Sequence, residues 1–153
     1  MRRNVLISVF ISSLFLLNCN AEKPGINESE NSSGSEVIPL TSATFKKMVF
    51  NYDLNKEWKY EGSKPAIIDF YADWCAPCRQ LSPLVDEIAQ EYAGKIAVYK
   101  VDTDEESALA QSLGITGLPT LLFIPAEGKP RVYMGLLPKE SLVEAVNEVL
   151  LIK

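Results

Sequence analysis

The chain has 153 residues, of which 47% are hydrophobic and 23% charged, and these values predict one folded domain rather than a disordered chain or a multidomain assembly. The formal net charge is −5, from 15 basic and 20 acidic side chains, so a nucleic acid is not an expected partner. The sequence contains no histidine, which excludes Ser-His and Cys-His catalysis and the zinc sites that use imidazole.

The N-terminal residues have the pattern of an export signal. Arg2 and Arg3 precede an apolar run over residues 5–17 that only serines interrupt. The run is too short to span a bilayer as a helix, and it matches the length of a signal-peptide core. We therefore expect the protein to be exported and residues 1–18 to be a signal peptide that takes no part in the fold.

The first of three cysteines follows this run. The tetrad Leu-Leu-Asn-Cys at residues 16–19 resembles the lipobox of bacterial lipoproteins, in which the cysteine becomes the lipidated first residue of the mature chain. This predicts a lipoprotein-type signal, with the lipid on Cys19 holding the protein to a membrane on the periplasmic side. Because Asn18 stands where such signals usually have Gly, Ala or Ser, a plain signal peptide cut near Ala21 and an uncleaved anchor remain alternatives.

A polar segment separates this cysteine from the folded part. Residues 20–36 are rich in Asn, Ser, Gly and Glu and contain one large aliphatic residue, Ile26. Such a segment cannot bury enough apolar area to offset the entropy that ordering would cost. We expect residues 19–36 to be a flexible tether and residues 37–153 to form the folded domain.

The folded part alternates between helical and extended patterns. A near-continuous apolar run at residues 66–72 is typical of a strand that is buried on both faces of a mainly parallel sheet, and apolar residues at spacings of three and four indicate amphipathic helices. In chain order we expect a helix from Thr41 or Ser42 to about 51, an ambiguous segment at 56–62 that suits a brief edge strand, a strand at 66–72, a helix from about 75 to 94, a strand at 96–101, a helix at 105–113, strands at 120–124 and 131–134 joined by a turn at 126–129, and a helix from about 139 to 151.

This order predicts an α/β fold. A strand, a helix and a second strand imply a right-handed crossover, and the later hairpin adds an antiparallel pair to the sheet. The expected architecture is a central mixed β-sheet flanked by helices on both faces.

The two remaining cysteines lie in the sequence Trp74-Cys75-Ala76-Pro77-Cys78. Cys75 follows the buried strand and opens a helix, and Cys78 lies on the same helical face, so the two sulfurs are within bonding reach. The helix N-terminus favours a thiolate and lowers a thiol pKa from about 8.5 toward about 7 or below. We therefore expect Cys75 to be the nucleophile, Cys78 to be the resolving thiol, and Arg79 to add a local positive charge.

Three other roles for the pair remain open. A zinc site would have only carboxylates to complete its four ligands, so no metal is expected. A purely structural disulfide would close too small a loop to constrain the unfolded chain much. Two inert buried cysteines would not be expected at a strand-to-helix junction.

Taken together, these residues resemble the thioredoxin family. The resemblance rests on residues 69–78, on the sequence Gly-Leu-Pro-Thr at residues 117–120, and on Gly135, and it extends from about residue 38 to 150. It implies the thioredoxin fold, a protein disulfide reductase or related thiol–disulfide oxidoreductase, and no cofactor besides the redox-active Cys75–Cys78 disulfide.

The resemblance also implies roles for residues away from the cysteines. Asp69 matches the buried family aspartate that deprotonates the resolving cysteine, so we expect it to act as general base toward Cys78. A polar residue on an edge strand is the alternative. The family usually places a lysine near this aspartate, and the aligned position here is Val98, with Lys100 two residues further on. Loss of that charge would raise the pKa of Asp69.

Pro119 matches the family's cis-proline opposite the cysteines. A cis bond would direct the backbone of Leu118 outward, where it could pair with an extended substrate segment. We expect a shallow apolar substrate groove around the Cys75 sulfur, with ordinary packing as the alternative for the tryptophan. Its expected rim is formed by Trp74, Ala76, Pro77, Gly117 and Leu118.

The dipeptide between the cysteines predicts a reductant. Strong periplasmic oxidants lie near −120 mV, thioredoxin-type centres lie near −270 mV, and the oxidants carry a histidine that this dipeptide lacks. The expected partners are disulfide-containing protein substrates and a membrane electron donor of the cytochrome-c-biogenesis or disulfide-reductase type. The alternatives are a thioredoxin-like protein of cytochrome c maturation, a disulfide oxidase or isomerase, and a binding module without activity.

Overall fold

The computed structural model describes residues 36–150 of the chain. The predicted signal peptide, the predicted lipidation site Cys19 and the predicted tether up to residue 35 lie outside the described residues, as does the predicted end of the last helix. Among the residues described, no helix is both long and apolar enough to cross a membrane.

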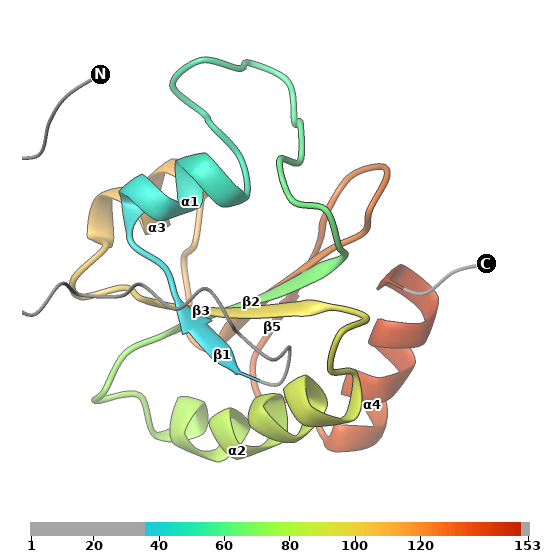
Figure 1. Cartoon of the computed structure of the whole chain (residues 1–153). Helices are drawn as coiled ribbons and strands as arrows, with labels where there is room; N and C mark the ends of the chain where they lie inside the picture. The colour runs from blue at the N-terminus through green and yellow to red at the C-terminus, as the bar shows by residue number, and fades with distance from the viewer. Residues whose placement is uncertain (1–35, 151–153) are drawn as a thin grey trace, which may run out of the picture. The chain divides into compact units, whose positions relative to one another are not determined.

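Five strands form one mixed sheet with the order β1-β3-β2-β4-β5 (Figure 1). β1 and β2 both run parallel to β3, whereas β4 is antiparallel to β2 and to β5. This confirms the mixed sheet expected from the order of the patterns. The strands are β1 (Val37–Pro39), β2 (Ala66–Tyr71), β3 (Ala97–Asp102), β4 (Thr120–Ile124) and β5 (Arg131–Met134).

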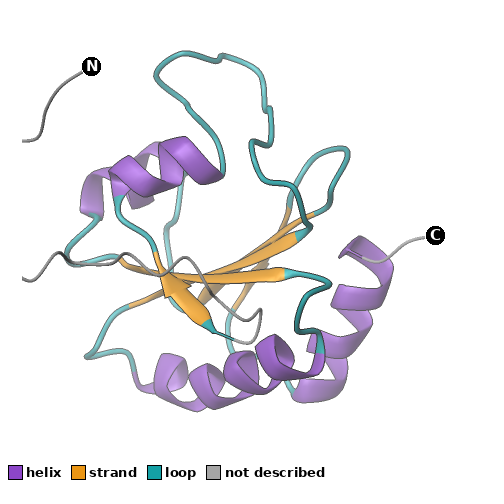
Figure 2. Cartoon of the chain, viewed as in Figure 1, coloured by secondary structure: helices purple, strands orange, loops and turns teal. Residues whose placement is uncertain are grey.

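Helices cover both faces of this sheet, as predicted (Figure 2). α1 (Ser42–Met48) and α3 (Ser107–Ser112) lie on one face; α2 (Ala76–Glu91) and α4 (Lys139–Ala145), which continues as a π-helical turn η1 (Val146–Leu150), lie on the other (Figure 1). The buried side chains accordingly form two core clusters, one on each face of the sheet.

The central strand β2 contributes to both clusters because successive side chains of a strand point to opposite faces. Ile67 packs in the cluster under α2 and α4, whereas Ile68 and Phe70 pack in the cluster under α1 and α3. By the same alternation, Asp69 points toward the face that α2 covers. β2 therefore places the carboxylate of Asp69 in the core beneath α2, the helix that contains Cys78.

The ends of several elements differ from the prediction. β1 was not predicted, because three residues are too few to show a strand period. α1 ends at Met48, where the helix was expected to reach about residue 51, since Val49 leaves the helical conformation with φ −122° and ψ −67°. α2 and α3 are each shorter by one to three residues at either end than expected, as is usual for helix boundaries.

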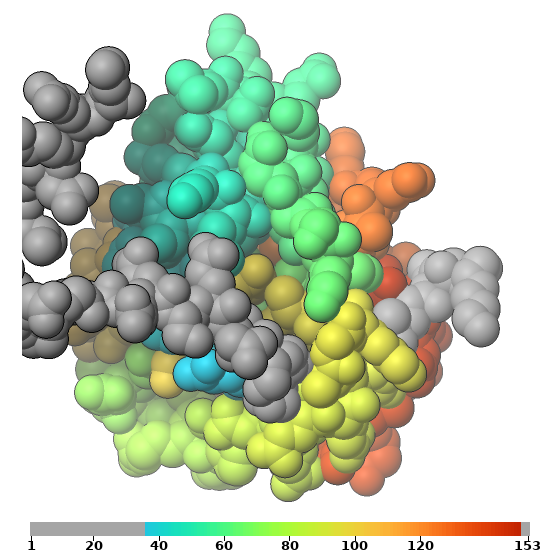
Figure 3. Space-filling model, viewed as in Figure 1, coloured from blue at the N-terminus to red at the C-terminus, as the bar shows by residue number. Residues whose placement is uncertain are grey.

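The segment after α1 is a loop and not the expected edge strand. Its aromatic residues pack instead of pairing along a sheet: the rings of Phe50 and Trp58 have centroids 4.8 Å apart. Both rings lie against the core cluster under α1 and α3, and side chains fill the gap that the ribbon leaves inside this loop (Figure 3). The aromatic pattern that suggested a strand is therefore explained by burial.

Candidate active site

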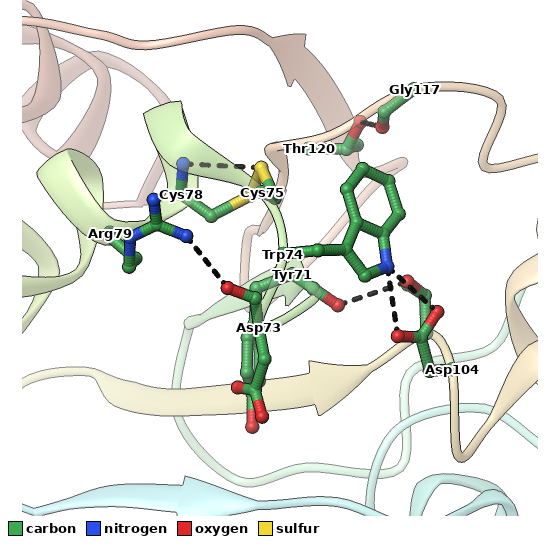
Figure 4. Close-up of a disulfide and its surroundings, with 10 residues drawn as sticks. Tyr71, Asp73, Trp74, Cys75, Cys78, Arg79, Asp104, Gly117 and Thr120 are labelled. Carbon is green, nitrogen blue, oxygen red and sulfur yellow. Dashed lines mark hydrogen bonds between the residues drawn. A yellow bond between two sulfur atoms is a disulfide. The ribbon is translucent and has the colours of Figure 1, made fainter.

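Cys75 and Cys78 form a disulfide at the start of α2, with an S–S distance of 1.99 Å and Cα atoms 5.3 Å apart. Each residue is only 3% exposed. Cys75 is the N-cap of the helix, and its Sγ accepts a hydrogen bond from the N–H of Cys78 at 3.2 Å (Figure 4). The pair predicted from the sequence is therefore bonded, and the sulfur of Cys75 takes the place of a capping oxygen.

Local chemistry explains why the helix begins at this point. After β2 the chain turns, and the N–H of Cys75 donates to the carbonyl of Ala72 at 3.1 Å. Pro77 lies in the first turn of α2, where its missing N–H costs nothing because that group has no partner inside the helix. The unpaired N–H groups of this turn give the sulfur of Cys75 a partly positive environment that stabilises a thiolate.

Asp69 is a buried carboxylate with an incomplete set of partners. It is 4% exposed, and its Oδ1 has no hydrogen-bond partner among the described residues. The pKa of Asp69 is raised from 3.8 to about 7: burial is the largest cause, the charge of Asp86 also raises it, and the charge of Lys100 lowers it. At neutral pH this carboxyl is therefore divided between its protonated and ionised forms.

The strand register corrects the expected neighbour of this carboxylate. Asp69 of β2 pairs with Lys100 of β3, whereas Val98 pairs with Ile67. A lysine therefore does lie beside Asp69, at Lys100, and the expectation that Asp69 lacks this charged neighbour was wrong. The pKa of Asp69 is raised all the same, because burial outweighs the lysine.

The loop before β4 faces the cysteine pair. The bond between Leu118 and Pro119 is cis, and Leu118 packs against the small cluster formed by Ala72, Cys75 and Cys78. The hydroxyl of Thr120 donates to the carbonyl of Gly117 at 2.7 Å across this bond, and the N–H of Gly135 donates to the carbonyl of Pro119 at 2.8 Å. These two hydrogen bonds fix the conformation of the loop around the cis bond.

The backbone of Leu118 is not used inside the described domain. Neither its N–H nor its carbonyl forms a backbone hydrogen bond with any residue of the described range. Both groups can therefore pair with an extended segment of another chain.

A hollow of about 210 Å³ lies next to Trp74 and Leu118, and neither Cys75 nor Cys78 lines it. It contains three of the residues expected at the substrate groove, Trp74, Gly117 and Leu118, whereas Ala76 and Pro77 are not among its lining residues. Four further lining residues were not predicted: Thr103, Ala110, Ile115 and Thr116. A larger hollow of about 250 Å³ lies elsewhere, at β1 and β3, and includes none of the site residues.

The sequence does contain a signal that could have predicted one of these four lining residues, Thr103. β2 and β3 are parallel, so the residues that follow the two strands lie at the same edge of the sheet. Cys75 follows β2, and Thr103 and Asp104 follow β3. The hydroxyl and the N–H of Thr103 both donate to the carbonyl of Tyr71, at 3.0 and 2.9 Å, which ties the two strand ends together.

Trp74 is held at the surface by a carboxylate. Its side chain is 69% exposed, which excludes ordinary core packing, and its indole N–H donates to Asp104, at 2.9 Å to Oδ2 and 3.3 Å to Oδ1 (Figure 4). On the other side of the cysteines, the guanidinium of Arg79 donates to the backbone carbonyl of Asp73 at 2.8 Å.

Acidic groups surround the tryptophan side of the site. Burial raises the pKa of the Tyr71 phenol, and the nearby charges of Asp102, Asp73 and Glu105 raise it further, in that order. Several carboxylates therefore lie near this phenol at the same edge of the sheet. In the part of the chain that the structure describes, no group of three or more Cys, Asp or Glu side chains is arranged to hold a metal ion.

Comparisons with known proteins agree with this geometry. The family model described as Thioredoxin matches residues 36–148. The chain is 44% identical over 111 residues to a thioredoxin of Borreliella burgdorferi, covering 72% of this chain and 95% of that protein, and 39% identical over 114 residues to thioredoxin 1 of a Nostoc species, covering 74% and 97%. The crystal structure of a chloroplastic thioredoxin z, 28% identical, superposes with a TM-score of 0.63 over 74% of this chain and 94% of that one.

Proposed function

Because the chain belongs to the thioredoxin family and is a thiol–disulfide oxidoreductase, we propose that it reduces disulfide bonds of proteins outside the cytoplasm. One observation carries the proposal: Cys75 and Cys78 form a disulfide at the N-terminus of a long helix, beside a loop that has unused backbone groups and lines a hollow. This arrangement suits a protein segment, since it offers a shallow surface and backbone pairing.

The reaction begins from the reduced pair. The thiolate of Cys75 attacks one sulfur of the substrate disulfide, forms a mixed disulfide and releases the other substrate sulfur as a thiolate, which takes up a proton. Cys78, after giving its proton to Asp69, attacks the sulfur of Cys75 and releases the second substrate sulfur as a thiolate, which takes up a proton. Two electrons pass from the pair to the substrate, and the domain ends with a Cys75–Cys78 disulfide.

The roles follow from position and chemistry. Cys75 is the attacking thiol because its sulfur lies at the helix N-terminus and accepts an N–H hydrogen bond. Cys78 lies in the first turn of α2, and Asp69 points from β2 toward the face of the sheet that α2 covers. A pKa of about 7 for Asp69 makes this carboxyl a suitable proton acceptor near neutral pH.

The dipeptide between the cysteines supports reduction as the direction. Neither Ala76 nor Pro77 has a polar or charged side chain. The dipeptide therefore lacks the thiolate-stabilising group that strong oxidants have between their cysteines. The expected reduction potential is near the thioredoxin value of about −270 mV. A measured potential of the Cys75–Cys78 pair above about −180 mV would contradict the reductase assignment.

The proposed location depends on the N-terminal sequence. The apolar run over residues 5–17 and the lipobox-like residues 16–19 support export with a lipid on Cys19, and the polar residues 19–36 support a tether. An exported reductase cannot be recharged by a cytosolic reductase, so we propose a membrane protein that passes electrons across the inner membrane as donor. If Cys75 and Cys78 stayed reduced in cells lacking every such conduit, the donor would be a different one.

Two variants test the chemistry directly. Cys75→Ser should abolish reduction of insulin disulfides, because it removes the attacking sulfur. Cys78→Ser should still attack but be unable to resolve, so it should accumulate mixed disulfides that run as covalent adducts on non-reducing gels. Full insulin-reducing activity in Cys75→Ser would refute the mechanism. Loss of the adducts in a Cys75→Ser, Cys78→Ser double variant is the matched control.

A further inference from the structure

The hollow of about 210 Å³ adjoins the expected substrate groove, because Trp74, Gly117 and Leu118 line it. Trp74 adjoins Cys75 in sequence, and Leu118 packs against the cluster that contains Ala72 and both cysteines. Adjacent residues of an extended segment are only about 3.3 Å apart along the chain. A segment whose sulfur meets Cys75 and whose backbone meets Leu118 therefore presents a neighbouring side chain to this hollow.

The walls of the hollow suit a long side chain with an apolar stem and a polar end. The indole of Trp74 is largely exposed and offers an open ring face, and Ile115 and Leu118 add aliphatic surface. Thr103 and Thr116 place residues with hydroxyl groups along the same lining. Lysine and arginine combine an apolar stem with a charged, hydrogen-bonding head in this way.

The charge nearest the indole of Trp74 is negative, whereas the guanidinium of Arg79 lies on the other side of the cysteines, where it donates to the carbonyl of Asp73. The carboxylate of Asp104 lies at the N–H edge of the Trp74 ring, and the N–H of Asp104 donates to the Oδ1 of Asp102 at 2.9 Å. Asp73 and Glu105 are exposed nearby. Within residues 36–150, none of these carboxylates forms an ion pair with a lysine or arginine.

We propose that this hollow selects substrates with an arginine or lysine next to the reactive disulfide, through the exposed ring of Trp74 and the carboxylate of Asp104. This inference rests on the proposed function and names the class of substrate that the site prefers. A cation over the indole face gains cation–π attraction, and a guanidinium that reaches Asp104 gains a charge-assisted hydrogen bond. A glutamate in the same place meets like charge.

Three synthetic peptides test the preference. Each has the same disulfide loop, and the residue next to one cysteine is arginine, glutamine or glutamate. The protein is reduced with dithiothreitol, freed of it and mixed with excess peptide. Acid quenching, alkylation and mass spectrometry then give the rate of reduction. We expect the arginine peptide to react about fivefold faster than the glutamine peptide, and the glutamate peptide to react more slowly than both. The ratios should fall toward one in 1 M salt.

The variant Asp104→Asn tests the assigned contact. The asparagine keeps an oxygen that can accept from Trp74 but loses the charge, so the ratio of the arginine rate to the glutamate rate should fall about threefold. Glu127→Gln removes an equally exposed carboxylate in the turn between β4 and β5, at the opposite end of β4 from Thr120, and should leave the ratio unchanged.

The outcomes separate the two proposals. Equal rates for all three peptides would overturn the charge preference while leaving the reductase function intact. An unchanged preference in Asp104→Asn would overturn the assignment of the contact. Failure of the wild-type protein to reduce any of the peptides, or insulin, would overturn the reductase function, and this inference with it.

Discussion

Removal of the buried carboxylate in β2 should change how stability depends on pH. Asp69 is 4% exposed, its Oδ1 has no hydrogen-bond partner among the described residues, and its pKa is raised to about 7, chiefly by burial. Asp69→Asn keeps the size and shape of the side chain and removes only its titration. The variant therefore isolates the contribution of this proton to the free energy of unfolding.

The sign follows from proton binding in the two states. Below pH 3.8 the carboxyl is protonated in both the folded and the unfolded chain. Between pH 3.8 and about 7 the unfolded chain has lost the proton that the folded protein still holds, so each pH unit lowers stability by about 1.4 kcal/mol. Above about pH 7 both states are ionised and the slope ends. From pH 5 to pH 8 this carboxyl should therefore remove about 2.5 kcal/mol of stability.

Urea denaturation of the oxidised protein at pH 5, 6, 7 and 8 and constant ionic strength measures this effect. The chain contains no histidine, so no imidazole adds to the slope. The stability of Asp69→Asn relative to the wild type should rise by about 2.5 kcal/mol over this range, whatever fixed cost the buried amide adds. Glu127→Gln, an exposed carboxylate, should follow the wild type. Parallel curves for Asp69→Asn and the wild type would refute the assignment of the raised pKa.

Three further substitutions test the fold around the site, all by urea denaturation. Phe123 is fully buried in β4, so Phe123→Ala should cost about 3–5 kcal/mol; a loss below 1 kcal/mol would contradict its place in the core. Glu106 accepts hydrogen bonds from the N–H and the hydroxyl of Ser42 at the start of α1, so Glu106→Ala should cost about 1 kcal/mol. Gly135 has φ +91°, so Gly135→Ala should cost roughly 1–2 kcal/mol, whereas Gly117→Ala, at a residue without positive φ and with open space around it, should cost less.

The sequence predicted best the elements whose pattern of apolar residues matches the burial of their side chains in the fold. β4 and β5 have the expected bounds, and α2 buries the apolar stripe that predicted it. Residues 56–62 were misread because Trp58 and Tyr60 suit a strand in composition, yet they pack as part of a loop against the core under α1 and α3. A short window of sequence cannot distinguish aromatic residues in a strand from aromatic residues that cover a core.

The site shows the same division between local and long-range information. The disulfide depends on residues three positions apart, so the sequence predicted it. The partner of Asp69 depends on the register between two strands, which pairs it with Lys100 and not with Val98. The contact between Trp74 and Asp104 joins residues 30 positions apart. Such contacts follow from the parallel pairing of β2 and β3, which places both strand ends at one edge.

The chain contains no histidine, so another side chain must accept the proton of Cys78 in the proposed mechanism. In the proposed mechanism the thiol of Cys78 must lose a proton near neutral pH, and an exposed carboxylate, with a pKa near 4, would be too weak a base. The pKa of Asp69 is raised to about 7, chiefly by burial beneath α2; the charge of Asp86 also raises it, and that of Lys100 lowers it. Burial in the core thus gives this aspartate a pKa that suits a proton acceptor near neutral pH, a role that histidine often has in other proteins. Because the same burial lowers stability as the pH rises toward 7, the property that suits Asp69 to the reaction is also one that destabilises the folded domain.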